Sequence, residues 1–109
     1  MIGLPYLSHM SSGIKVVAPV TISNINCGFD VLGIALEHTC DEIIGREHKK
    51  PGIHLNLVGP NARATPADPH KNTATVAIMK MLEFLGDTDK VGLEINIRKT
   101  IYPGSGLGS

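Results

Sequence analysis

Residues 91–109 constrain the fold of this chain more than any other stretch, because a strand pattern runs directly into a glycine-rich loop. Apolar and polar residues alternate over 91–99, which is the period of a half-buried β-strand. The loop that follows has glycine at every second position, Gly104, Gly106 and Gly108. Glycine accepts positive φ angles and lacks the Cβ that would keep a ligand away from the backbone. The amides of such a loop can converge on one anion, so a phosphate group is the predicted ligand.

This loop alone does not define a nucleotide site. No Lys-Ser or Lys-Thr pair follows the last glycine, so it is not a Walker A loop, and its Gly-x-Gly-x-Gly spacing differs from the dinucleotide fingerprint. A flexible Gly/Ser turn that closes the strand is the alternative interpretation. A helix beginning near Leu107 would add free amides and a positive dipole end to the attraction for phosphate.

The charge balance limits the partners that the chain can bind. Ten basic and ten acidic residues cancel, so there is no general attraction for nucleic acid or an anionic membrane, and an anion site has to be local. Two Phe, two Tyr and no Trp offer few platforms for stacking bases. No apolar run approaches the roughly 20 residues of a membrane span. Cys27 and Cys40 lack metal-type or redox-type spacing, so a reduced, cytoplasmic protein is expected.

The remaining patterns predict an α+β fold, with a helix packed on one face of a mixed β-sheet. Apolar residues recur with helical spacing over 72–85, with Asn72 as the N-cap, Gly86 as the C-terminal stop and one apolar face that is buried. Irregular chain is expected at 21–30 and 59–71. Strands are expected at 14–18, 31–36, 41–46, 53–58 and 91–99, the second and third being separate strands joined by a turn.

The chain is expected to divide into a leader and one domain. Residues 1–13 show no periodicity and contain a Ser-His-Met run typical of cloning junctions, so they are interpreted as a disordered or vector-derived leader. Residues 14–109 then form a single domain.

Two motifs, taken together, resemble a known family. One is Asn24-x-x-x-Gly28-Phe29-Asp30-x-Leu-Gly, and the other is the terminal Pro-Gly-Ser-Gly-Leu-Gly-Ser of residues 103–109. Both are similar to the amino-terminal part of the homoserine kinases: the first is characteristic of these enzymes, and the second is shared by the whole GHMP family of small-molecule kinases. The resemblance covers 14–109 and implies a partial amino-terminal GHMP-kinase domain that ends at the phosphate-binding loop.

This resemblance implies roles for particular residues. It assigns the loop to binding ATP, through Pro103, Gly104, Ser105, Gly106, Leu107, Gly108 and Ser109. It places Asn24 and Asp30 where homoserine kinases hold the amino acid, and a carboxylate and an amide suit a zwitterion. A pair of Asx turns that hold their own loop is the alternative for these two residues. Asn72 falls where related kinases place an Asn near adenine, although helix capping explains it equally well.

The implied reaction moves the γ-phosphoryl group of ATP to the side-chain hydroxyl of L-homoserine, giving O-phospho-L-homoserine in threonine biosynthesis. The substrate hydroxyl attacks in line, so no catalytic residue is assigned within this chain. The resemblance places the Mg²⁺ ligands outside these residues, makes the remainder of the chain a partner and leaves a homodimer open. Because phosphoryl transfer needs that missing charge neutralisation, the chain by itself is expected to be inactive.

Two other functions stay open at this point. Another GHMP kinase with a different small alcohol as acceptor would share the loop, and competition by mevalonate or a sugar would reveal it. A non-catalytic nucleic-acid-binding module would share the general shape of the domain. Neutral charge and scarce aromatic residues argue against that module, and a gel shift with structured RNA tests it.

Overall fold

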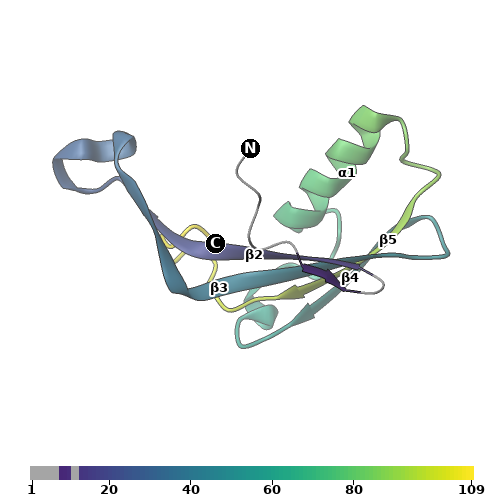
Figure 1. Ribbon diagram of the computed structural model, residues 1–109, viewed down its shortest axis with the longest axis horizontal. Helices are drawn as coiled ribbons and strands as arrows, with labels where there is room; N and C mark the ends of the chain where they lie inside the picture. Colours follow the sequence, from purple (N-terminus) through teal and green to yellow (C-terminus); the bar gives the residue numbers. More distant parts are fainter. Residues whose placement is uncertain (1–7, 11–12) are drawn as a thin grey trace.

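The computed structural model describes residues 8–10 and 13–109, in which five strands form one sheet and a helix covers part of one face (Figure 1). In chain order the elements are β1 (Ser8–Met10), β2 (Gly13–Ser23), the 3₁₀ helix η1 (Asn26–Val31), β3 (Gly33–Glu47), β4 (Gly52–Val58), the 3₁₀ helix η2 (Ala62–Ala64), α1 (Thr73–Leu85) and β5 (Gly92–Arg98). The strand order is β1-β2-β3-β5-β4. Only β4 and β5 pair in parallel, so the sheet is mixed and the predicted α+β class is confirmed.

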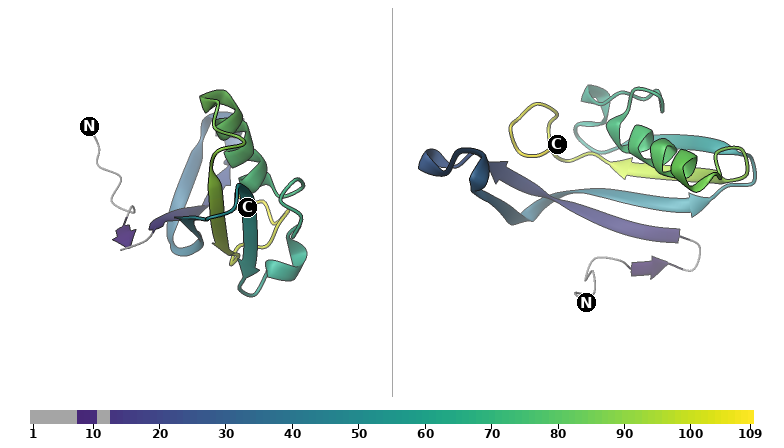
Figure 2. Two further views of the ribbon diagram at one scale, coloured as in Figure 1. Left: turned by 90° about the vertical axis from the view of Figure 1, so that its right-hand side faces the viewer. Right: turned by 90° about the horizontal axis from the view of Figure 1, so that it is seen from above.

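The β4-α1-β5 unit forms as its sequence pattern predicts. Parallel neighbours need a crossover connection, and α1 supplies it on the β4–β5 side of the sheet (Figure 2). The Asn72 side chain accepts a hydrogen bond from the Ala74 amide at 3.1 Å, which caps the helix. Gly86 ends it in the left-handed conformation, with φ of 76°. The helix therefore begins and ends where its local chemistry predicts.

The β2–β3 hairpin differs from the prediction. β2 continues past Pro19, and β3 is one strand where two strands joined by a turn are expected. Pro19 pairs with Cys40 but Val20 pairs with Leu36, so residues 37–39 form a bulge. Proline has no N–H to donate to the ladder, and the bulge lies where that bond is lost. The polar tract that suggests a turn thus bends a continuous strand.

The predicted leader is described only in part. Ser8–Met10 form β1, which pairs antiparallel with β2, and Gly13 already belongs to β2. Ser8–Met10 thus add a strand to the sheet, because the edge of β2 offers backbone N–H and C=O groups to any extended segment, whatever its side-chain pattern. The leader stays a prediction. Residues 1–7 and 11–12 lie outside the described part of the chain.

Few apolar side chains are buried in the part of the chain that the structure describes. They are those of Val20, Ile95, Ile97 and Ile101. The predicted apolar face of α1 is only partly covered, because the helix packs mainly against β4, an edge strand. Met81 and Leu85 of that face are exposed, and so is most of Phe84. A second exposed apolar region, which includes Val31, lies at the η1 end of the hairpin. Among the described residues, no helix is long and apolar enough to cross a membrane.

Candidate functional site

The glycine loop, residues 103–109, has the backbone conformation that its spacing predicts. Gly104, Gly106 and Gly108 have φ angles of 75°, 77° and 75°, so every second residue is left-handed. The loop folds back on β2, where the Thr21 amide donates a hydrogen bond to the Leu107 carbonyl at 3.0 Å. Loop amides are therefore held in a curved, defined arrangement instead of a free turn.

This contact brings the two motifs to one side of the molecule. Thr21 lies three positions before Asn24, so the glycine loop sits beside the end of the hairpin that carries η1 (Figures 1 and 2). A Cβ atom on Gly108 would overlap the Thr21 hydroxyl, which shows how closely the two backbones approach. The two motifs therefore do not lie on opposite sides of the molecule.

The predicted substrate residues lie on the exposed hairpin end. Asn24 and Asp30 are both exposed, and Asn24, Asn26 and Phe29 have positive φ angles of 58°, 46° and 43°. Asparagine tolerates this region, but Phe29 has a bulky side chain for which it is unfavourable. Such backbone conformations are frequent at ligand sites. Neither Asn24 nor Asp30 lines the cavity of about 260 Å³ that lies beside Asn72 and Ser109.

A buried ion pair lies where β5 turns into the glycine loop. The Lys99 ammonium is 2.5 Å from Asp41 Oδ2, and the two residues are only 7% and 8% exposed. Asp41 Oδ1 accepts hydrogen bonds from the amides of Thr100 and Ile101, at 2.7 Å and 2.9 Å. Lys99 Nζ also donates to Ser109 Oγ. The Asp41 carboxylate thus holds the two residues just before Tyr102 and the glycine loop. Through Lys99 it also holds Ser109.

Sequence patterns do not reveal this pair. Asp41 looks like one polar residue of a strand, and Lys99 looks like a solvated charge at a strand end. The available signal is a carboxylate two positions before the apolar pair Ile43 and Ile44, together with a lysine four positions before Pro103. Their pairing depends on the antiparallel register of β3 and β5, in which Glu42 lies opposite Arg98.

A cavity of about 260 Å³ joins the predicted nucleotide residues from two distant parts of the chain. Its lining includes Asn72 from the helix N-terminus, Gly108 and Ser109 from the loop, and the Asp41–Lys99 pair. Pockets for whole small molecules have about 300–1,000 Å³, so this one suits a phosphate group or part of a nucleotide. The first five residues of the glycine loop do not line it.

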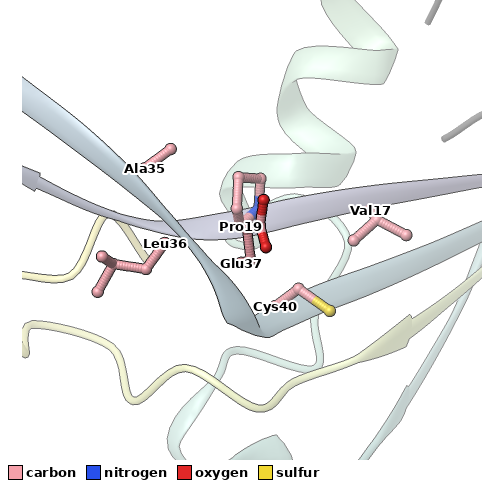
Figure 3. A pocket seen from close by; sticks show the side chains of 6 residues that line it. All are labelled: Val17, Pro19, Ala35, Leu36, Glu37 and Cys40. Atoms are coloured by element: carbon pink, nitrogen blue, oxygen red, sulfur yellow. The ribbon is translucent and has the colours of Figure 1, made fainter. Parts of the chain in front are cut away.

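Two larger hollows lie along the hairpin. One, of about 310 Å³, surrounds the bulge and is lined by Val17, Pro19, Ala35, Leu36, Glu37 and Cys40 (Figure 3). Another, of about 490 Å³, shares Leu36 and Glu37 and reaches Leu107 of the glycine loop. All three linings are mainly apolar, but the smaller cavity also includes the polar side chains of Asp41, Asn72 and Lys99. Convergent polar groups mark a binding site better than volume does, so the smaller cavity is the stronger candidate.

The described residues do not fit a protein-held magnesium ion. They contain no group of three or more His, Cys, Asp or Glu side chains that could hold a metal. Asp41, the carboxylate that lines the cavity, already has both oxygens engaged by Lys99 and two backbone amides.

Asn72 is a helix cap in this structure. Its side chain is 2% exposed, accepts from the Ala74 amide and donates from Nδ2 to the Pro66 carbonyl at 3.0 Å. Thr75 adds a hydrogen bond from Oγ1 to the Pro69 carbonyl at 2.5 Å. The capping interpretation is confirmed, and contact with adenine stays a prediction.

Replacing Asn72 by alanine is expected to destabilise the chain by about 1–2 kcal/mol, because the helix loses its cap. Asn72→Ser keeps a neutral side-chain acceptor for the Ala74 amide, so we expect a smaller loss. Urea unfolding followed by circular dichroism measures both variants. Equal losses would mean that the Nδ2 bond to Pro66, which both variants lack, carries the stability.

Comparison with known proteins gives consistent matches. No family model matches the chain. Homoserine kinases from Methanocella arvoryzae and Methanococcus vannielii are 43% and 40% identical to it over 96 residues, which is 88% of this chain and 29% and 31% of those proteins. The homoserine kinase of Chloroherpeton thalassium is 35% identical over 100 residues, covering 84% of this chain and 31% of that protein.

A crystal structure of homoserine kinase from Cytophaga hutchinsonii superimposes with a TM-score of 0.81 at 40% identity, covering 95% of this chain and 32% of that one. The chain spans about a third of the length of the curated relatives it matches. These matches confirm both the resemblance and the fold class. The chain is therefore a homologue of part of the homoserine kinases, and its fold matches about a third of the Cytophaga hutchinsonii enzyme.

Proposed function

We propose that this chain supplies the nucleotide-binding part of a homoserine kinase, which transfers the γ-phosphoryl group of ATP to the hydroxyl of L-homoserine and yields O-phospho-L-homoserine for threonine biosynthesis. The observation that carries the proposal is the cavity that Asn72 shares with Gly108 and Ser109. Support also comes from relatives that are 32–43% identical and carry the name homoserine kinase.

In this proposal the glycine loop binds the phosphates of ATP through its backbone amides. Lys99 is the cation at this cavity, but its charge is already balanced by Asp41. The amides therefore have to supply most of the attraction, as in other backbone anion nests. The adenine would extend toward Asn72, which lines the same cavity.

Asn24 and Asp30 would hold the amino acid. The Asp30 carboxylate accepts hydrogen bonds from the α-ammonium group, and the Asn24 amide can bond either end of the zwitterion. The hydrogen bond between Thr21 and Leu107 keeps this segment next to the glycine loop. A bound L-homoserine would then have its hydroxyl beside the phosphates.

The reaction needs no covalent intermediate on the protein. The homoserine oxygen forms a bond to the γ-phosphorus as the bond from that phosphorus to the β-phosphate oxygen breaks. ADP leaves, and the hydroxyl proton passes to solvent. Within this chain the residues contribute binding and alignment of the two substrates. We propose Mg²⁺ as a cofactor, because it neutralises phosphate charge in phosphoryl transfer. Groups other than the described residues would hold it.

We also propose the setting in which the enzyme acts. Its partners are small molecules and the remainder of its own chain, as a cytoplasmic protein that binds neither nucleic acid nor membranes. The balanced charge of the chain supports this view.

A chimera tests the proposed activity. The matched 96-residue segment of the Methanocella arvoryzae homoserine kinase is replaced by the corresponding residues of this chain. We expect ADP release that depends on L-homoserine, with O-phospho-L-homoserine identified by phosphorus NMR. A matched control carries alanine at Gly104, Gly106 and Gly108. A folded chimera that leaves L-homoserine unmodified, or prefers mevalonate or a sugar, would overturn the assignment.

A further inference from the structure

We infer that Asp41 is a positioning residue for the glycine loop, and that its loss weakens the binding of ATP while leaving the binding of L-homoserine nearly unchanged. This inference rests on the proposed function. It assigns a role to a β3 side chain that lies outside both sequence motifs.

The first argument is that one carboxylate holds the residues that lead into the loop and, through Lys99, also Ser109. Asp41 Oδ1 accepts from the consecutive amides of Thr100 and Ile101, which fixes the direction in which the chain leaves β5. Asp41 Oδ2 holds Lys99, whose ammonium also donates to Ser109 Oγ. The Ser109 hydroxyl in turn lies 3.4 Å from the Ile101 carbonyl. Residues 99–109 therefore close into a ring that is anchored on Asp41.

A second argument comes from the cost of burying this pair. Both side chains are about nine-tenths buried, and moving two charges out of water costs several kcal/mol per ion before their attraction is counted. Well-packed apolar side chains often replace such pairs with equal or greater stability. Stability alone is thus a weak reason for a buried ion pair here. A requirement for fixed geometry at the loop explains it better.

The neighbouring ion pair provides a matched comparison. Glu42, the next residue of β3, pairs with Lys15 at 2.7 Å, and both side chains are roughly 30% exposed. This pair joins β3 to β2 and forms no hydrogen bond with a loop residue. Removing it changes the charge of the same strand but leaves the loop anchors in place.

The test measures the KM values for ATP and L-homoserine in the chimera described above. Asp41→Asn removes the charge that holds Lys99 and keeps a similar shape. We expect the KM for ATP to rise about tenfold and the KM for L-homoserine to change less than about twofold. Glu42→Gln is expected to leave both within about twofold. Equal rises in both KM values for Asp41→Asn, or a lowered melting temperature with an unchanged KM for ATP, would show that Asp41 only supports the fold.

A further variant keeps the inference falsifiable if Asp41→Asn does not fold, and a double variant tests the coupling to Lys99 if it does fold. Asp41→Glu retains the charge but lengthens the side chain, so the ion pair persists while the corner shifts, and the KM for ATP should still rise. A wild-type KM for this variant would contradict positioning. In a Lys99→Met background, Asp41→Asn should raise the KM for ATP by a smaller factor, since the two residues act on the loop together. Fully multiplicative effects would contradict that coupling.

Failure of the proposed function would look different. A wild-type chimera that binds ATP by calorimetry but does not phosphorylate L-homoserine would refute the kinase assignment. The dissociation constant for ATP of Asp41→Asn would still test the anchor in that case, with a tenfold rise supporting it and an unchanged value contradicting it. A wild-type chimera that does not bind ATP would overturn both.

Discussion

Replacing Gly108 by alanine is expected to raise the dissociation constant for ATP at least about a hundredfold, whereas the same change at Gly106 raises it about tenfold or less. Both glycines are left-handed, with φ of 75° and 77°, so both changes introduce similar backbone strain. At Gly108 the new methyl group would also overlap Thr21 Oγ1, while at Gly106 nothing lies within 4 Å of it. The added clash would push the loop away from β2 and break the bond between Thr21 and Leu107. Calorimetric titration of the chimera with ATP measures the difference.

A second substitution, at Thr21, separates the steric clash at position 108 from the backbone strain of alanine at a positive φ angle. Thr21→Gly removes the side chain that the new methyl group would meet, so Gly108→Ala combined with it should bind ATP about as well as Gly106→Ala. Similar losses for Gly106→Ala and Gly108→Ala in the presence of Thr21 would show that close packing against β2 does not matter for the loop.

Replacing Asp30 by asparagine is expected to raise the KM for L-homoserine at least about tenfold and to change the KM for ATP less than about twofold. The amide keeps the size of the side chain but no longer offers a charge to the α-ammonium group. Because Asp30 is exposed, its replacement should hardly affect the free energy of unfolding. Steady-state kinetics of the chimera with each substrate varied in turn gives both constants.

Asp89→Asn is the matched control for this prediction. Asp89 is an exposed aspartate in the connection between α1 and β5, so losing its charge should leave both constants within about twofold. If Asp30→Asn instead raised both KM values equally, Asp30 would be a residue that merely holds the η1 segment in shape.

Local chemistry was sufficient for the ends of α1, for β5 and for the glycine conformations of the loop. Helix α1 begins after an Asn cap and ends at a left-handed glycine, as its sequence predicts. β5 follows its alternating pattern, and the glycines of the loop take positive φ angles. These features depend on contacts within a few residues, which is why sequence patterns reveal them.

The hairpin and the helix face required the whole molecule. A strand that continues through Pro19 is stable only because residues 37–39 of β3 bulge opposite it. β1 forms because β2 has a free edge with which it can pair. The side-chain pattern of β1 itself does not predict a strand. The exposure of Met81 reflects how little sheet surface lies beneath α1. In each case the structure depends on residues that lie elsewhere in the chain, so a local sequence pattern cannot reveal it.

For the candidate site, the residue types alone predicted an anion-binding glycine loop, and the family resemblance implied that Asn24 and Asp30 hold an amino acid. Tertiary structure alone decided that Asp41 meets Lys99, 58 positions away, and that Asn72 shares a cavity with the end of the loop. The reason is physical. Backbone conformation at glycine and capping residues is set by neighbours in the chain, whereas a buried ion pair exists only once the β3–β5 register has brought its two charges together.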